Sequence, residues 1–115
     1  MKNDTLGKLF ELQKKFQIRI YGDVDELPKE MPEKIPMQIT SLVAELGEIL
    51  EENQKWKNWR KKVPPVNYEN LLVEVVDAFH FLINIALFLG FGADEVYSKF
   101  IEKNKENLYR QNNNY

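Results

Sequence analysis

Four carboxylates form two pairs with the same spacing, Glu45-x-x-Glu48 and Glu74-x-x-Asp77. Side chains three positions apart lie on one face of an α-helix. If each pair lies on a helix and the two helices are neighbours, the carboxylates face one another across a shared gap. Ligands that are all oxygen suit Mg²⁺ or Mn²⁺ rather than zinc or copper, and these ions take further ligands from water and phosphate. The spacing therefore indicates a divalent-metal site that can receive a phosphorylated ligand.

The second pair lies in an apolar run, Leu71 to Phe91, that contains no Lys or Arg. At about 100° per residue, the polar side chains of Glu74, Asp77, His80 and Asn84 fall on one narrow stripe of a helix. A helix that is apolar on every other side is normally buried, and a buried carboxylate needs a partner, a proton or a metal ion. The run therefore favours a metal site. For His80 two interpretations stay open: a group beside the metal or a ligand's base, or a hydrogen-bonded core histidine.

Taken alone, the Glu45 pair has a simpler explanation, because like charges at helical spacing are common on solvated helix faces. That explanation weakens when the two pairs are considered together. The connection between them is short and contains Pro64 and Pro65, so the two helices should be antiparallel neighbours. The joint pattern favours a shared metal site.

Hydrophobic periodicity predicts four helices in a single all-α domain covering residues 1–115. The expected helices span residues 4–20, about 37–59, from a cap at Asn67 to Gly90, and about 93–111. Residues 21–36 show no period and contain Gly22 and Pro28, which predicts a loop. Gly90 suits a left-handed C-terminal cap.

Two glutamines, Gln13 and Gln17, fall on the apolar stripe of the first helix. Either one can lie at the margin of the core or present its amide to a polar ligand. The margin of the core is favoured for Gln17, whereas both interpretations stay open for Gln13.

The end of the fourth helix is polar: Lys103, Asn107 and Arg110 share one side, and Asn104 lies on the next. Cations and amides over two turns can bind phosphate oxygens. They are equally compatible with a solvated C-terminus, where the helix dipole favours positive charges. Spacing alone favours the solvated terminus.

The formal net charge of −2 argues against a broad surface for duplex nucleic acid. The absence of cysteine excludes disulfides and zinc–thiolate sites and fits a cytoplasmic location. Leu71 to Phe91 is long enough to span a bilayer, but its acidic residues and lack of basic flanks argue against a membrane. We therefore expect a soluble homodimer or homotetramer in which a second subunit covers this helix.

Both carboxylate pairs resemble the metal motifs of the all-α nucleotide pyrophosphohydrolases, the superfamily of MazG-like proteins and dimeric dUTPases. The dimeric dUTPase branch is similar over most of the chain from Thr40 onward. The segments that carry the resemblance are residues 42–48, Trp56-Lys-Asn-Trp59, 71–91, 103–111 and the terminal Tyr115. The family usually has Gly before that tyrosine, whereas this chain has Asn114. It is also shorter than typical members, which suggests that a partner subunit completes the site.

The resemblance implies a four-helix, MazG-like fold packed as a dimer or dimer of dimers. It implies a Mg²⁺-dependent diphosphatase that converts dUTP to dUMP and diphosphate, with two or more Mg²⁺ ions for which Mn²⁺ can substitute. The metal ligands would be Glu45, Glu48, Glu74 and Asp77, with Glu45 and Glu48 catalytic and Glu48 favoured as the general base. Phosphate would be bound by Lys103, Asn107, Arg110 and Lys57, and the nucleoside by Gln13, Trp59, His80, Asn84 and Asn104.

Two alternatives remain at this stage. The chain can be a house-cleaning pyrophosphatase for dCTP or for modified pyrimidine nucleotides, as in the MazG-like branch. It can also be a non-catalytic helical interaction module whose carboxylates form salt bridges across an interface.

Overall fold

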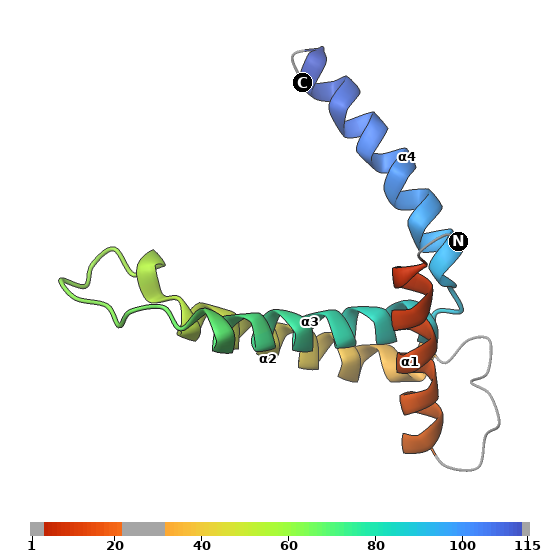
Figure 1. Ribbon diagram of the computed structural model, residues 1–115, viewed down its shortest axis with the longest axis horizontal. Coiled ribbons are helices and arrows are strands. Elements are labelled where there is room, and N and C mark those ends of the chain that lie inside the picture. Colours follow the sequence, from red (N-terminus) through yellow and green to blue (C-terminus); the bar gives the residue numbers. More distant parts are fainter. Residues whose placement is uncertain (1–3, 22–31, 114–115) are drawn as a thin grey trace.

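The computed structural model describes residues 4–21 and 32–113, and over these ranges the chain is all-α with no strand. This confirms the predicted fold class. Figure 1 shows the elements in chain order. They are α1 (Thr5–Ile20), the 3-10 turn η1 (Pro32–Lys34), α2 (Ile35–Glu52), the 3-10 turn η2 (Gln54–Trp56), α3 (Tyr68–Phe88) and α4 (Ala93–Asn112). The predicted positions of Gly22, Pro28, Asn114 and Tyr115 lie outside the described residues.

An antiparallel pair of helices, α2 and α3, forms the longest contact in the chain (Figure 1). Helix α1 crosses one end of this pair, where α2 begins and α3 ends. Helix α4 leaves from the same end, contacts chiefly α1, and projects away from α2 and α3. The connection of residues 53–67, which contains η2 and both prolines, thus places α2 beside α3, as expected.

Three helix ends follow local capping rules. The side chain of Asp4 accepts a hydrogen bond from Gly7 N at 2.9 Å, and that of Asn67 accepts from Glu69 N and Asn70 N at 3.1 Å each. Helix α3 ends in a Schellman motif, in which Phe91 N donates to Ala86 O and Gly90 N to Leu87 O. Gly90 has φ 84°, a left-handed conformation that glycine adopts without strain.

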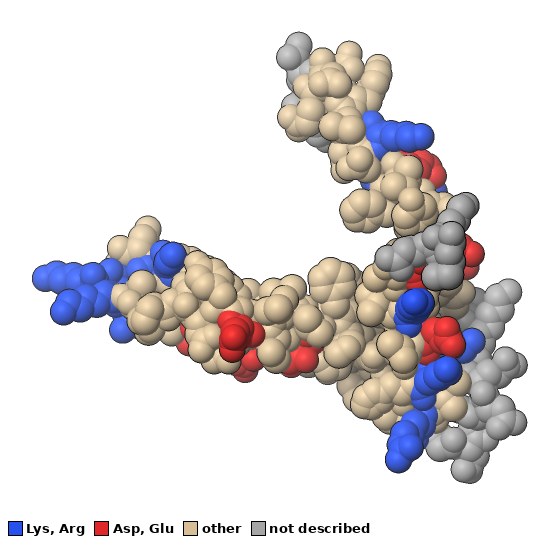
Figure 2. Space-filling view, in the orientation of Figure 1, with Lys and Arg blue, Asp and Glu red and all other residues tan. Residues whose placement is uncertain are grey.

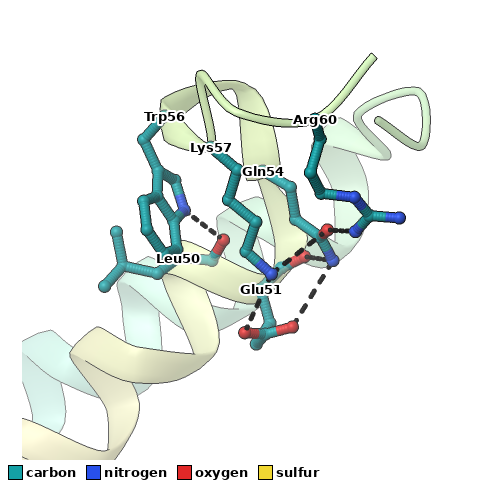
Figure 3. A network of polar contacts seen from close by, with 6 residues as sticks. All are labelled: Leu50, Glu51, Gln54, Trp56, Lys57 and Arg60. Carbon is teal, nitrogen blue, oxygen red and sulfur yellow. Dashed lines mark hydrogen bonds and ion pairs between the residues drawn. The ribbon is translucent and has the colours of Figure 1, made fainter. Parts of the chain in front are cut away.

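Helix α2 ends at Glu52, so the prediction that it extends to Trp59 is wrong. Asn53 leaves the helix in an extended conformation, and its side chain accepts a hydrogen bond from Lys55 N. Such local bonds from asparagine compete with helix continuation. The chain then folds back, because Trp56 Nε1 donates to Leu50 O at 2.9 Å (Figure 3).

The apolar residues of one chain are mostly not buried. Only Phe10, Ile83 and Phe88 are buried apolar side chains among the described residues. The radius of gyration is 17.8 Å, compared with about 13 Å for a compact domain of this length. Large exposed apolar side chains follow one face of α2 and one of α3: Ile39, Val43, Leu46 and Leu50, and Leu72, Val73, Val76 and Phe79.

The most apolar element, α3, is long and apolar enough to cross a membrane by length and composition. This observation is weak evidence by itself, because the core helix of a soluble protein passes the same test. Acidic side chains at the middle of the helix would be costly in lipid.

The Asn67 cap provides a test of the α3 boundary. Replacing Asn67 with Ala should lower the free energy of unfolding by about 1 kcal/mol, because two backbone N–H groups lose their acceptor. Asn67→Asp keeps an acceptor and should leave stability nearly unchanged. Urea unfolding of both variants at one protein concentration measures the difference, and equal stability of Asn67→Ala and the unmodified chain would contradict the assignment.

Candidate metal centre

Three carboxylates from two helices meet between α2 and α3. Each of Glu45, Glu74 and Asp77 offers an oxygen, and these oxygens lie within 4.8 Å of one another. All three residues are half-buried. The helical spacing places Glu74 and Asp77 on one face of α3, and the antiparallel packing brings Glu45 of α2 against that face.

The electrostatics of this cluster are unfavourable without a cation. Partial burial, a hydrogen bond shared with Glu45 and the negative charges of Glu45, Asp77 and Glu48 together raise the pKa of Glu74 above its usual value. Glu45 Oε2 is buried and has no hydrogen-bond partner among the described residues. An unpartnered buried carboxylate oxygen is costly. This set of oxygens fits a hard divalent cation, which would give Glu45 Oε2 a partner and neutralise the repulsion.

Lysine and arginine form ion pairs with acids elsewhere in the described chain, namely with Glu11, Glu51, Glu102 and Glu106. Glu106, on α4, has its pKa lowered by a hydrogen bond from Lys103 and by the charges of Arg110 and Lys103. The cluster on α2 and α3 therefore differs from Glu102 and Glu106 of α4, which have basic partners.

The fourth predicted metal ligand, Glu48, is not in the cluster of three. It lies one turn further along α2 and is exposed, but its charge contributes to the raised pKa of Glu74. Glu48 thus lies at the solvent edge of the cluster.

Buried amides continue the polar contact between α2 and α3. Gln13 Nε2 donates to Asn84 Oδ1 at 2.7 Å, and Asn84 Nδ2 donates to Gln38 Oε1 at 3.0 Å. All three residues are at most 8% exposed. Gln13 and Asn84 were predicted from the sequence and lie together. Gln38 was missed, although its spacing of seven residues from Glu45 on one helix face is a usable signal. We call Gln38 and Glu45 of α2, with Glu74, Asp77 and Asn84 of α3, the polar seam.

The other predicted nucleoside ligands do not lie beside the buried amides of Gln13, Gln38 and Asn84. Trp59 is 68% exposed and packs edge-to-face on Trp56, with ring centroids 5.6 Å apart, in the connection beyond α2. His80 is exposed on α3 in a single chain. Asn104 is exposed on α4.

The predicted phosphate ligands are also separated from the carboxylates. Lys57 Nζ lies 3.4 Å from Gln54 Oε1 and 3.8 Å from Glu51, close to Arg60 (Figure 3). Figure 2 shows basic side chains gathered at this end of the α2–α3 pair. Lys103, Asn107 and Arg110 lie on α4, which points away from the carboxylates (Figure 1). One chain therefore brings three of the four predicted metal ligands together, and it leaves the predicted phosphate ligands of α4 away from them.

The repulsion in the cluster provides a test. In the presence of a chelator, Glu74→Gln should raise the melting temperature, because a charge is removed from beside two other carboxylates. Divalent cations should raise the melting temperature of the unmodified chain through binding, and this increase should be lost in Glu74→Gln.

The matched control is Glu69→Gln in the first turn of α3, where a negative charge is favoured by the helix dipole. It should keep the cation response and become no more stable without metal. A Glu74→Gln variant that is less stable than the unmodified chain in chelator would contradict the assignment.

Comparison with known proteins places these residues in context. The model of a dUTPase family matches residues 5–89, which include the carboxylate cluster and the buried amides but not α4. The chain is 28% identical to the dCTP pyrophosphatase of Enterobacteria phage T4, over 99% of this chain and 84% of that protein. No solved structure gives a significant match.

Two further relatives are longer than this chain. A DNA replication protein of Enterobacteria phage T4 is 27% identical over 93% of this chain and 35% of its own length. A dCTP pyrophosphatase of Enterobacteria phage LZ5 is 30% identical over 56% of this chain and 44% of its own length. The chain thus spans most of the first relative and less than half of these two.

Proposed function

The chain belongs to the dUTPase family, and from that premise we propose that it is a divalent-metal-dependent diphosphatase of pyrimidine deoxynucleoside triphosphates. The observation that carries the proposal is the cluster of Glu45, Glu74 and Asp77 with its unpartnered Glu45 Oε2. Such a cluster is suited to a hard cation, and such a cation is suited to a triphosphate. The family favours dUTP as substrate. The name of the relative that aligns with 99% of this chain favours dCTP as a second candidate.

The reaction breaks one phosphoanhydride bond. Water attacks the α-phosphorus in line, a new P–O bond forms, and diphosphate leaves with the electrons of the broken bond. When bound, two or more Mg²⁺ ions would neutralise the triphosphate and lower the pKa of water near the α-phosphorus. Glu45, Glu74 and Asp77 would hold the metal.

Glu48 is the proposed general base. It is exposed, so water can reach it, whereas Glu45 and Glu74 are half-buried and share a hydrogen bond. A solvent-exposed carboxylate close to the predicted metal ligands can accept the proton of the attacking water. The amides of Gln13 and Asn84 are the proposed contacts of the base.

A second copy of the chain is needed to complete this site. The phosphate ligands Lys103, Asn107 and Arg110 lie on a helix that projects from its own α2–α3 pair (Figure 1). The exposed apolar faces of α2 and α3 require cover, and a second copy offers matching faces. We propose a homodimer, or a dimer of dimers, in which α4 of one subunit reaches the carboxylates of its partner. The same arrangement covers α3 with protein rather than lipid, as in a cytoplasmic enzyme.

Catalysis by the cluster is tested with a nucleotide panel. With Mg²⁺, or with Mn²⁺ in its place, the chain should release diphosphate from dUTP or dCTP, and a chelator should abolish the release. Asp77→Asn and Glu45→Gln should each lower kcat/KM by at least about 100-fold, because a direct metal ligand is lost. Glu69→Gln should keep full activity. An Asp77→Asn variant with unchanged metal-dependent turnover would end the proposal.

Completion of the site by a partner is tested by mixing two inactive variants. Asp77→Asn keeps α4 intact, and Lys103→Ala/Arg110→Ala keeps the carboxylates intact. If α4 acts on the partner, unfolding and refolding the two together should restore activity, up to about a quarter of the unmodified level for random dimers.

Refolding each variant alone is the control and should restore nothing. Sedimentation should show an oligomer at micromolar concentration for every variant. A monomer, or no recovery in the mixture, would contradict completion by a partner while leaving the carboxylate assignment intact.

A further inference from the structure

The connection between α2 and α3 carries a concentration of positive charge that the proposed reaction does not use. Residues 55–62, which we call the basic tip, contain no acid and five basic residues: Lys55, Lys57, Arg60, Lys61 and Lys62. The whole chain has a net charge of −2, so the +5 of the tip leaves −7 for the remainder. Figure 2 shows this charge at the end of the α2–α3 pair that lies opposite α1. An anionic ligand would therefore be attracted to one small surface of an acidic protein.

Three of the five cations are available to a ligand. Lys57 Nζ lies 3.4 Å from Gln54 Oε1, and Arg60 Nη1 donates to the same oxygen at 2.9 Å (Figure 3). The other three are exposed, and their ammonium groups have no hydrogen bond or ion pair within the described residues: Lys55, Lys61 and Lys62. Ammonium groups spaced over eight residues can contact successive phosphates of a flexible strand.

Two tryptophans, the only ones in the chain, lie among these cations. Trp56 is held in place, because its Nε1 donates to Leu50 O at 2.9 Å and Lys57 Nζ lies 5.3 Å from its ring centroid. Trp59 packs edge-to-face on Trp56, with ring centroids 5.6 Å apart, and is 68% exposed. Edge-to-face contact leaves at least one face of each ring uncovered by the other. Trp59 therefore offers a flat apolar surface on which a planar group can stack.

A stacking surface beside cations matches single-stranded nucleic acid, whose phosphates and bases are both accessible. In a duplex the bases are stacked inside, so the tryptophans would contribute little to binding. A lipid surface would require aliphatic side chains that can insert, whereas the aliphatic neighbours Val63 and Val66 are half-buried. A tip that serves only solubility would not need two exposed indoles.

We propose that the basic tip is a binding site for single-stranded nucleic acid. A base stacks on Trp59, while Lys55, Lys61 and Lys62 contact phosphates of the same strand. This binding is separate from the proposed reaction, because the carboxylate cluster lies further along α2 and uses none of these side chains.

The two tryptophans allow binding at the tip to be observed directly. An oligothymidylate of about 12 nucleotides should quench the intrinsic tryptophan fluorescence, and the anisotropy of the same strand carrying a fluorescent label gives the Kd. Both are measured in chelator, where no metal-dependent hydrolysis takes place. The slope of log Kd against log salt concentration should be about 2, as expected for three phosphate contacts on a single strand.

Two variants separate the contributions of charge and stacking. Lys61→Ala/Lys62→Ala should raise the Kd about tenfold at low salt and lower the salt slope to about 0.7, because two phosphate contacts are lost. Trp59→Leu should raise the Kd about tenfold and leave the slope unchanged, because stacking carries no charge. The matched control is Lys14→Ala/Lys15→Ala, which removes the same charge from exposed positions on α1 and should keep both the Kd and the slope.

The proposal is overturned if the strand causes no quenching, if a duplex of the same length binds equally well, or if the control variant is weakened as much as Lys61→Ala/Lys62→Ala. Phosphatidylglycerol vesicles that shift the tryptophan emission to shorter wavelength, when the strand has no effect, would assign the tip to a membrane surface instead. Displacement of the strand by dUTP or dCTP would assign the tip to the nucleotide site. Inactivity toward every nucleotide, in contrast, would contradict the proposed function and leave this measurement unaffected.

Discussion

The candidate site depends on negative charges held close together between two helices. Glu45, Glu74 and Asp77 are half-buried together, and one oxygen of Glu45 has no partner within the described chain. Apolar side chains of similar volume would pack the same space at lower cost. An arrangement that raises the pKa of one of its own acids does not stabilise the fold by itself, and its presence is explained most simply by a cation that the cluster binds.

The apolar residues are distributed in a related way. Helix α2 packs on α3 through an edge that contains Gln38, Leu42, Glu45 and Ile49, while the centre of its apolar stripe faces outward. The polar seam therefore occupies the intramolecular contact, and the most apolar faces are left for contact with another chain. In most domains, the apolar faces of the helices pack against each other within one chain. Here the intramolecular contact contains the polar residues instead. This arrangement also explains why one chain alone is extended and has a small core.

Local features of the sequence were sufficient for much of this arrangement. Hydrophobic periodicity and the caps at Asn67 and Gly90 predicted the helices, because these rules act within one or two turns. The paired carboxylates and the proline connection predicted the meeting of α2 with α3. Gln38 was missed because a single polar residue in an amphipathic helix does not reveal which neighbour it contacts. The end of α2 at Glu52 depended on one Asn53 bond, which competes with a continuing apolar pattern. The direction of α4 depends on its contact with α1, which is distant in the sequence, so no local pattern predicts it.

The polar seam also fixes the alignment of the two helices. Antiparallel apolar helices can slide past one another by a turn with little change in buried area, since one aliphatic side chain packs much like the next. Here Gln38 must meet Asn84 while Glu45 meets Glu74 and Asp77, and both contacts are seven residues apart along α2. A shift by one turn would leave the amide of Gln38 without its partner, remove one of the two hydrogen bonds of Asn84 and separate the carboxylates. The rearranged apolar packing would not offset that cost. Specific alignment thus comes from the polar residues, as a buried asparagine fixes register in coiled coils. The residues proposed to bind metal and base are therefore the ones that hold the helices at the spacing such binding requires.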